Sequence, residues 1–74
     1  NSDVLNTKLR SARKFILERK YEDAVEDYLF IIEKNVKWEN GISKDELLSL
    51  FAFLGNSNAI TISGRGRLLN ILYK

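Results

Sequence analysis

The apolar residues of segment 21–34 recur at spacings of three and four, and this pattern constrains the fold more than any other feature. Such spacing places them on one face of an α-helix. Acidic side chains fill the first turns and Lys34 lies in the last turn, as the helix dipole favours. We therefore predict a helix over 21–34 whose buried face carries Tyr21, Ala24, Val25, Tyr28, Leu29 and Ile32.

A second amphipathic segment precedes this one, from about residue 3 to residue 18. Its apolar spacing is again helical, and only two or three residues separate it from Tyr21. Because so short a connection leaves no room for a crossover, the two predicted helices must form an antiparallel hairpin. The apolar stripe of this first segment is Leu5, Leu9, Ala12, Phe15 and Ile16.

A third helix is expected from about 42 to 54, after an Asn-Gly turn at residues 40–41. Ser43 and Glu46 have the spacing of a capping box, in which two side chains bind backbone N–H groups at the helix start. Gly55 follows the last apolar residue and is typical of a helix C-terminus. The inner stripe of this helix is Leu47, Leu50, Phe51 and Leu54.

The C-terminal stretch fits two structures. A fourth helix over about 58–72 would bury its apolar residues against the other helices. Thr61, Ile62 and two glycines are poor helix formers, so we expect its first half to be weak or kinked. The alternative is an edge strand and turn over 61–68. Taken together, the pattern predicts an all-α chain of four helices in two antiparallel hairpins.

Composition excludes several classes of chemistry. The chain has no histidine and no cysteine, which removes the commonest zinc ligands, disulfides and a Ser-His-Asp triad. Asp23, Glu26 and Asp27 lie close together, but we interpret them as a solvated acidic face because nothing suggests a desolvated cleft. We expect a protein that is not an enzyme and needs no cofactor or metal. No apolar run approaches the ~20 residues of a membrane span, so we also expect a soluble, cytoplasmic protein.

The charges are segregated along the chain. The net charge is +2, but residues 1–20 carry +4, residues 21–54 carry −5 and residues 55–74 carry +3. On adjacent helices, such segregation favours attraction between helices as readily as it favours an external partner. We therefore interpret the segregation as attraction between helices rather than as the mark of an external partner.

The first two predicted helices resemble a tetratricopeptide repeat. Ala12 and Ala24 stand where small residues would let the two helix backbones approach closely. Phe15, Tyr21 and Tyr28 stand where the repeat has aromatic residues that fill the remaining space. The resemblance implies an α-α superhelix fragment with these five residues as the repeat core.

Two positions depart from the repeat pattern. The glycine usual between the helices is replaced by Arg19 or Lys20, and the proline usual after the second helix is replaced by Val36. These departures leave the spacing of the small and aromatic residues intact.

The second half of the chain resembles the C-terminal tetratricopeptide-like domain of the thioredoxin-like chaperedoxins (the YbbN, or CnoX, family). The resemblance covers roughly residues 5–73. Gly64 and Gly66 depart from it, because the family has tyrosine and arginine there. The matching features, in the family's order and distance, are Asn40-Gly41, Ser43-Lys44, Leu54-Gly55, Arg65, Leu68 and Leu72-Tyr73.

This resemblance implies both an origin and a role. Residues 1–74 would form one domain, the C-terminal fragment of a longer, bacterial-type thioredoxin-like protein. Its role would be that of a co-chaperone module, which docks unfolded clients or chaperones and packs against upstream repeats of the same chain. It supplies no redox chemistry of its own.

Candidate partner-surface residues lie in the second half of the chain. Leu48 and Phe53 fall off the buried stripe of the third helix, and Trp38 could either anchor the preceding loop or contact a partner. Arg65 and Arg67 are the basic members of this candidate partner surface. They also support an alternative function, a small basic helical module that binds nucleic acid. A further alternative is a structural cap that closes a repeat array.

Overall fold

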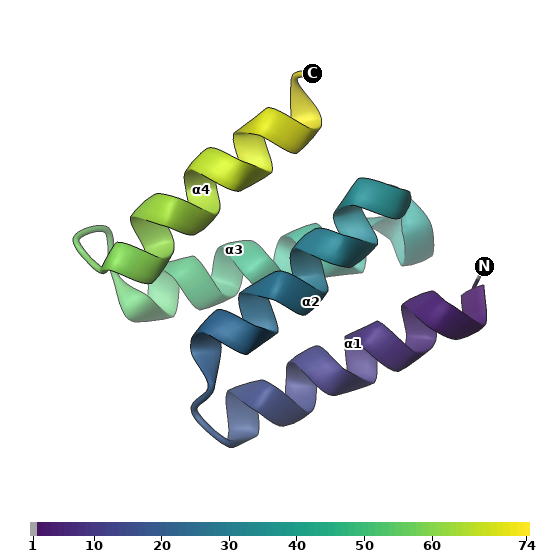
Figure 1. The fold of residues 1–74 in the computed structure, drawn as a ribbon, viewed down its shortest axis with the longest axis horizontal. Coiled ribbons are helices and arrows are strands. Elements are labelled where there is room, and N and C mark those ends of the chain that lie inside the picture. Colours follow the sequence, from purple (N-terminus) through teal and green to yellow (C-terminus); the bar gives the residue numbers. More distant parts are fainter. Residues whose placement is uncertain (1) are drawn as a thin grey trace.

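The computed structural model describes residues 2–74, apart from the side chain of Ser2. This part of the chain is all-α, as predicted, and the alternative edge strand over 61–68 does not form. The α-helices and one short 3-10 helix follow each other along the chain (Figure 1). They are α1 (Ser2–Leu17), α2 (Tyr21–Lys34), η1 (Trp38–Gly41), α3 (Ile42–Leu54) and α4 (Ala59–Leu72).

Helix α2 lies at the centre of the fold. It packs against α1, α3 and α4, and Figure 1 shows α1 and α4 on opposite sides of it, with α3 behind. Burial on several sides explains why seven of its fourteen residues are buried. Both predicted hairpins are present, and the α3–α4 hairpin packs against α2 of the α1–α2 hairpin.

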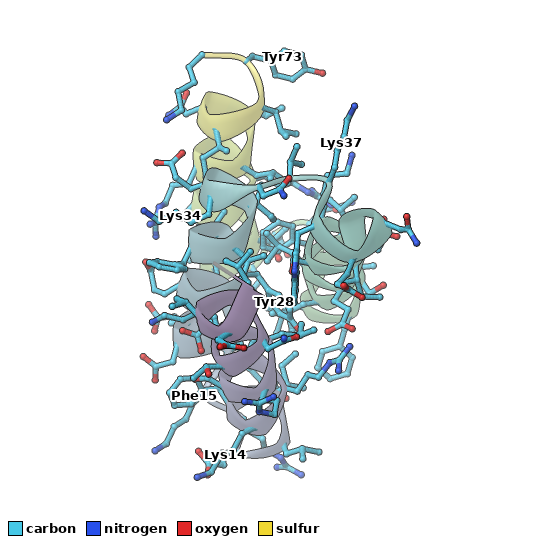
Figure 2. All side chains as sticks on the ribbon, turned by 90° about the vertical axis from the view of Figure 1, so that its right-hand side faces the viewer. Lys14, Phe15, Tyr28, Lys34, Lys37 and Tyr73 are labelled. Atoms are coloured by element: carbon cyan, nitrogen blue, oxygen red, sulfur yellow. The ribbon has the colours of Figure 1, made fainter. Side chains whose placement is uncertain are left out.

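Small residues set the distance between α1 and α2. Ala12 and Ala24 are completely buried, which lets the two helices approach closely. Tyr28 is also buried, whereas Phe15 and Tyr21 are only half-buried and pack at the edge of the core. Figure 2 shows Tyr28 pointing from α2 toward the interior between the helices, while Lys37 and Tyr73 project away from it.

Arg19, in the connection after α1, has a backbone conformation that L-residues rarely adopt. Its φ is 62°. The Lys20 N–H donates to the Phe15 carbonyl at 2.8 Å and the Arg19 N–H to the Ile16 carbonyl at 3.0 Å. These two bonds form a Schellman motif, in which glycine is usual at the left-handed position because other residues are strained there by about 1–2 kcal/mol.

The helix α3 spans the predicted residues 42–54 but does not have the predicted cap. Glu39, Asn40 and Gly41 all have positive φ, and Gly41 is the N-cap residue without a side-chain cap. Ser43 therefore lies inside the first turn, where its hydroxyl is buried without a hydrogen-bond partner. Glu46 binds other helices instead. The capping-box prediction is wrong, because the left-handed turn makes Gly41 the N-cap residue and leaves Ser43 inside the helix.

The helix α4 is regular and does not have the predicted weak or kinked first half. Asn58 caps it by accepting a hydrogen bond from the Ile60 N–H at 2.8 Å. Thr61 is completely buried, so packing outweighs its low helix propensity. Gly64 lies directly against Phe51: a Cβ at Gly64 would be 2.5 Å from the Phe51 Cζ. Glycine is thus required there for close approach of α3 and α4.

Ion pairs join the chain's acidic middle to its basic ends, in line with the expected attraction between helices. Each of them joins two different helices or a helix and the C-terminal residue. Those between α1 and the middle are Lys8–Asp27 and Arg13–Glu46, and those from the C-terminal segment are Arg67–Glu26 and Lys74–Glu33.

Replacing Arg19 with glycine should stabilise the protein. The relief of left-handed strain exceeds the entropy that glycine adds to the unfolded chain, so Arg19→Gly should raise the free energy of unfolding by about 0.5–1 kcal/mol. Urea denaturation measures this change. Lys20→Gly is the matched control: the φ of Lys20 is −96°, so glycine relieves no left-handed strain there and should give no comparable gain. Lower stability of Arg19→Gly would contradict the assignment of strain.

The two glycines inside α4 should respond to alanine with opposite signs. Gly64→Ala should lower the free energy of unfolding by about 1–3 kcal/mol, because the new methyl group collides with the buried Phe51 ring. Gly66 has no atom within 4 Å of its Cβ position, so Gly66→Ala should raise stability by up to about 1 kcal/mol. Thermal or urea denaturation distinguishes the two. Stabilisation by both substitutions would show that the Gly64 contact is unimportant.

Candidate functional site

An open groove lies between α1 and α3, with side chains of α2 at its base. Its larger part, which we call the Phe53 pocket, has a volume of about 480 Å³. The lining is mostly apolar, with polar groups concentrated where α1 and α3 are joined. The pocket is formed by Arg13, Ile16 and Leu17 from α1, Tyr21 and Tyr28 from α2, and Glu46, Ser49, Leu50 and Phe53 from α3.

Large apolar side chains are exposed at the mouth of the Phe53 pocket. Leu17 is 85% exposed and Phe53 is 72% exposed. The rings of Phe53 and Tyr21 lie with their centroids 6.0 Å apart and tilted by 57°, a favourable aromatic geometry. Exposed apolar side chains that converge on one pocket are typical of an interaction site.

A polar network closes the other side of this pocket. The Arg13 Nε donates to Glu46 Oε1 at 3.1 Å and the Arg13 Nη2 donates to Glu46 Oε2. The Tyr28 hydroxyl donates to the same Glu46 Oε1 at 2.8 Å. One carboxylate therefore joins α1, α2 and α3.

This network shifts the ionisation of its members. The hydrogen bonds from Arg13 lower the pKa of Glu46 below its usual range; the bond from Tyr28 adds to this effect, while partial burial opposes it. Burial raises the pKa of Tyr28 well above its usual value, and the hydrogen bond to Glu46 raises it further. At neutral pH the network therefore consists of a charged Arg13–Glu46 pair and a neutral phenol.

A second, smaller pocket continues the groove beyond Arg13. We call it the Trp38 pocket; its volume is about 250 Å³. Arg13 lines both pockets, whereas its partner Glu46 lines the Phe53 pocket. The other residues of the Trp38 pocket are Asn6, Leu9, Glu39 and Ile42.

The structure brings together some of the predicted partner-surface residues but not all. Trp38, which is half-buried, and Phe53 line the two pockets of one groove. Leu48 is exposed on the opposite side of α3. Arg65 and Arg67 lie on α4. The sequence therefore predicted two groove residues together with three that lie elsewhere.

Sequence reasoning did not identify Leu17, Arg13 and Glu46 as groove residues. Leu17 had a usable signal, because it is a large apolar residue one position beyond the buried stripe that ends at Ile16. Arg13 and Glu46 had none, since 33 residues separate them and only the packing of α1 near α3 unites them.

The basic residues of α4 already have partners inside the fold. Both terminal nitrogens of the Arg67 guanidinium bind the carboxylate of Glu26. The Arg65 guanidinium lies 6.0 Å from the centroid of the Phe51 ring, a cation–π distance. These two residues do not form a free basic patch with the amino-terminal segment.

The acidic cluster of α2 is not uniformly solvated, in contrast to the expectation. Asp27 is only 6% exposed and its Oδ1 lies 3.6 Å from the Lys8 Nζ. Helical spacing places Asp27 on the side of α2 that packs against α1. Its carboxylate is therefore buried although it is a charged group. Asp23 and Glu26 are exposed.

A second apolar surface lies on α4, outside the groove. Ile62, Leu69 and Tyr73 are all more than half exposed and recur at spacings of seven and four, which places them on one face of the helix. Gly66 falls between them on this face. This stripe has no counterpart in the partner residues that the sequence predicted.

Two further properties concern membranes and metals. Every helix within residues 2–74 is too short or too polar to cross a membrane. In this same part of the chain, no group of three or more His, Cys, Asp or Glu side chains is arranged to hold a metal ion.

Paired antiparallel helices with small residues at their contact and an open groove beside them define an α-helical repeat protein. A family model described as "Tetratricopeptide repeat" matches residues 1–73, nearly the whole chain, and the protein belongs to this family. No curated protein and no solved structure shows a significant match. Domains of this family generally mediate protein–protein interactions, and such a fold is typically not enzymatic.

The Glu46 network should make stability depend on pH. The pKa of Glu46 is lower in the folded than in the unfolded state. The ionised carboxylate therefore stabilises the fold at pH values above the unfolded-state pKa of about 4.3. This stabilisation is lost as the pH falls through the folded-state pKa. Glu46→Gln should therefore lower the free energy of unfolding by about 1 kcal/mol at pH 7, and the difference should vanish near pH 2. Urea denaturation across this range measures it.

Glu26→Gln is the matched control for this pH series. Arg67 also lowers the pKa of Glu26, but the Glu26 side chain is 58% exposed, against 26% for Glu46. Solvent screening should make its effect smaller at every pH. A Glu46→Gln effect that does not change with pH would contradict the proposed role of the ionised carboxylate.

Proposed function

We propose that this protein binds apolar segments of other proteins in the groove between α1 and α3. The observation that carries the proposal is the Phe53 pocket, an apolar pocket of about 480 Å³ with Leu17 and Phe53 exposed at its mouth. Helical repeat proteins use the concave side of their helix stack for recognition. Burial of exposed apolar side chains supplies the driving force for such binding.

The cellular context that we propose is a thioredoxin-like co-chaperone of the cytoplasm. Residues 1–74 would be its C-terminal domain, and the bound segments would come from unfolded clients or chaperones. Support comes from the order of motifs from Asn40-Gly41 to Leu72-Tyr73, which resembles the chaperedoxin family. An apolar groove suits unfolded clients, because these expose the side chains that folded proteins bury.

The two alternative functions receive less support. Nucleic-acid binding was suggested by Arg65 and Arg67, yet Arg67 forms an ion pair with Glu26 and Arg65 lies over the Phe51 ring, which leaves these two side chains less available for phosphates. A terminal cap of a repeat array needs a polar outer face. The face of α4 that carries Leu69 and Tyr73 is apolar and exposed, which is unsuitable for that role.

Binding should depend on Phe53 and not on Leu48. Phe53→Asp places a charge in the apolar pocket and should weaken binding of a permanently unfolded protein, with its disulfides reduced and alkylated, by at least about tenfold. Leu48→Asp, on the opposite side of the same helix, should leave binding unchanged. Fluorescence anisotropy of the labelled unfolded protein measures both, and circular dichroism verifies that both variants fold. Equal loss in both variants would contradict the assignment of the groove.

The co-chaperone context has a separate test. Removal of residues corresponding to 1–74 from the full-length protein should weaken its binding to unfolded clients or to chaperones in a pull-down assay. Unchanged binding after the deletion would overturn the proposed context.

A further inference from the structure

The exposed apolar stripe of α4 has a symmetric spacing. It consists of Ile62, Gly66, Leu69 and Tyr73, which are separated by four, three and four residues. The Tyr73 N–H donates to the Leu69 carbonyl at 3.0 Å, so Tyr73 continues the last helical turn. Because the spacing is the same from either end, a second copy of α4 that runs antiparallel meets this stripe position by position, with Tyr73 opposite Ile62.

The stripe faces away from the rest of the fold. Arg67 binds Glu26 of α2, and Gly64 lies against Phe51 of α3, so these two positions of α4 mark its packed sides. Leu69 and Gly66 each follow one of them by two residues, which is about 200° around the helix. Figure 1 shows α4 at the edge of the molecule, where another helix can approach.

Gly66 is not required for packing within one chain. A Cβ at this position would meet no atom within 4 Å among the described residues, although glycine weakens the interior of a helix. In an antiparallel pair, the partner's Leu69 lies over Gly66 and fills the space that its missing side chain leaves. A parallel pair would place glycine against glycine and leave this space empty. The position of Gly66 therefore favours the antiparallel arrangement.

The charges of α4 allow two copies to approach. Arg67 and Lys74 are neutralised by ion pairs with α2. Arg65 is the remaining basic residue; it forms no ion pair in the part of the chain that the structure describes, and it lies beside the Phe51 ring. Each copy thus brings one uncompensated and exposed charge to the contact, and its repulsion is screened by solvent and salt.

The size of the stripe predicts a weak dimer. Tyr73 is 81% exposed, Ile62 61% and Leu69 54%. Full burial removes about 150–250 Å² for a large aromatic side chain and about 60–120 Å² for leucine or isoleucine, so each copy offers about 200–350 Å² of apolar surface. Two copies together stay below the about 1,200 Å² of a standard interface, and we expect a dissociation constant of about 10–100 µM.

We propose that the protein forms a weak antiparallel homodimer through the α4 stripe, in which the occupant of this face is a second copy of the same chain. Since both copies use the same surface, the contact is saturated at two subunits. The stripe lies outside the groove between α1 and α3, so the dimer is a property separate from the proposed function.

Analytical ultracentrifugation of the 74-residue chain tests the proposal. The mean mass should rise from that of a monomer toward that of a dimer between about 5 and 500 µM. Leu69→Asp should weaken self-association by at least about tenfold, because it places a charge in the apolar contact. Leu48→Asp is the matched control, since Leu48 is an exposed leucine of α3 outside the stripe, and it should leave the mass unchanged.

Two results of the ultracentrifugation would overturn the proposal. The first is a chain that stays monomeric at about 500 µM, which would leave the stripe as a site for a different protein. The second is an equal loss of self-association in Leu69→Asp and Leu48→Asp.

Gly66→Gln separates dimer formation from the stability of the monomer. Glutamine is a good helix former, but its side chain fills the space that the partner's Leu69 occupies. The affinity of the dimer should fall by at least about tenfold, whereas the free energy of unfolding at low micromolar concentration should stay constant or rise. A Gly66→Gln dimer of unchanged affinity would show that the stripes are not in close contact and would overturn the proposal.

Single cysteines test the antiparallel register, because the chain has none of its own. A mixture of the Ile62→Cys and Tyr73→Cys variants should form disulfide-linked dimers on mild oxidation, since these positions lie opposite each other. Two copies of residue 62 would be about 16 Å apart along the helix axis, beyond the reach of a disulfide. Each variant alone should therefore form few such dimers. More linkage in the single variants than in the mixture would contradict the antiparallel pair.

Salt distinguishes a second copy from an acidic protein on the same face. Self-association should be as strong at about 500 mM salt as at about 50 mM, because no opposite charges hold the two copies together. An acidic partner bound through Arg65 would lose affinity over this range, so marked weakening of self-association by salt would contradict the apolar contact.

Dimer formation and groove binding should fail independently. Leu69→Asp should bind the permanently unfolded protein as tightly as the unchanged chain does, since Leu69 lies outside the groove. If the chain is monomeric and Phe53→Asp still weakens binding of the unfolded protein, only the dimer is wrong. If the chain dimerises and Phe53→Asp has no effect on that binding, only the proposed function is wrong.

Discussion

The groove depends on one interaction, the set of hydrogen bonds that the Glu46 carboxylate accepts from two other helices. This carboxylate accepts hydrogen bonds from Arg13 on α1 and Tyr28 on α2 while belonging to α3. The helices α1 and α3 are distant along the chain, and this bridge joins them across an otherwise open groove. Arg13, which this bridge holds, lines both pockets of the groove.

The bridge can act only because close packing fixes α2 between the other helices. Ala12 and Ala24 bring α1 and α2 together, and Gly64 brings α4 against the Phe51 ring of α3. These small residues let helices approach where a larger side chain would separate them. The core thus holds the helices, while the polar bridge and the exposed Phe53 make the groove a surface for recognition.

The fold could be predicted from the sequence to a large extent, because helical periodicity and short connections are local signals. The errors arose where tertiary contacts override local preference. Ser43 and Glu46 have capping-box spacing, but Glu46 serves α1 and α2 instead. Thr61 has low helix propensity, but its burial keeps α4 regular.

The groove could be predicted only in part, for the same reason. Trp38 and Phe53 are unusual in their own segments, so the sequence indicated them as candidate partner residues. The groove that they both line also needs the packing of α1 near α3, which no local pattern encodes. The exposed stripe of α4 that includes Leu69 was likewise hidden, because its spacing is that of an ordinary buried helix face.

The most direct test of the central claim is a titration of the ¹⁵N-labelled protein with the permanently unfolded protein, followed by amide chemical shifts. The account predicts that the shifts change along residues 13–21 and 46–53, on the two walls of the groove, while those of residues 62–73 stay constant. Changes confined to residues 62–73 would place the binding surface on α4 and contradict the account.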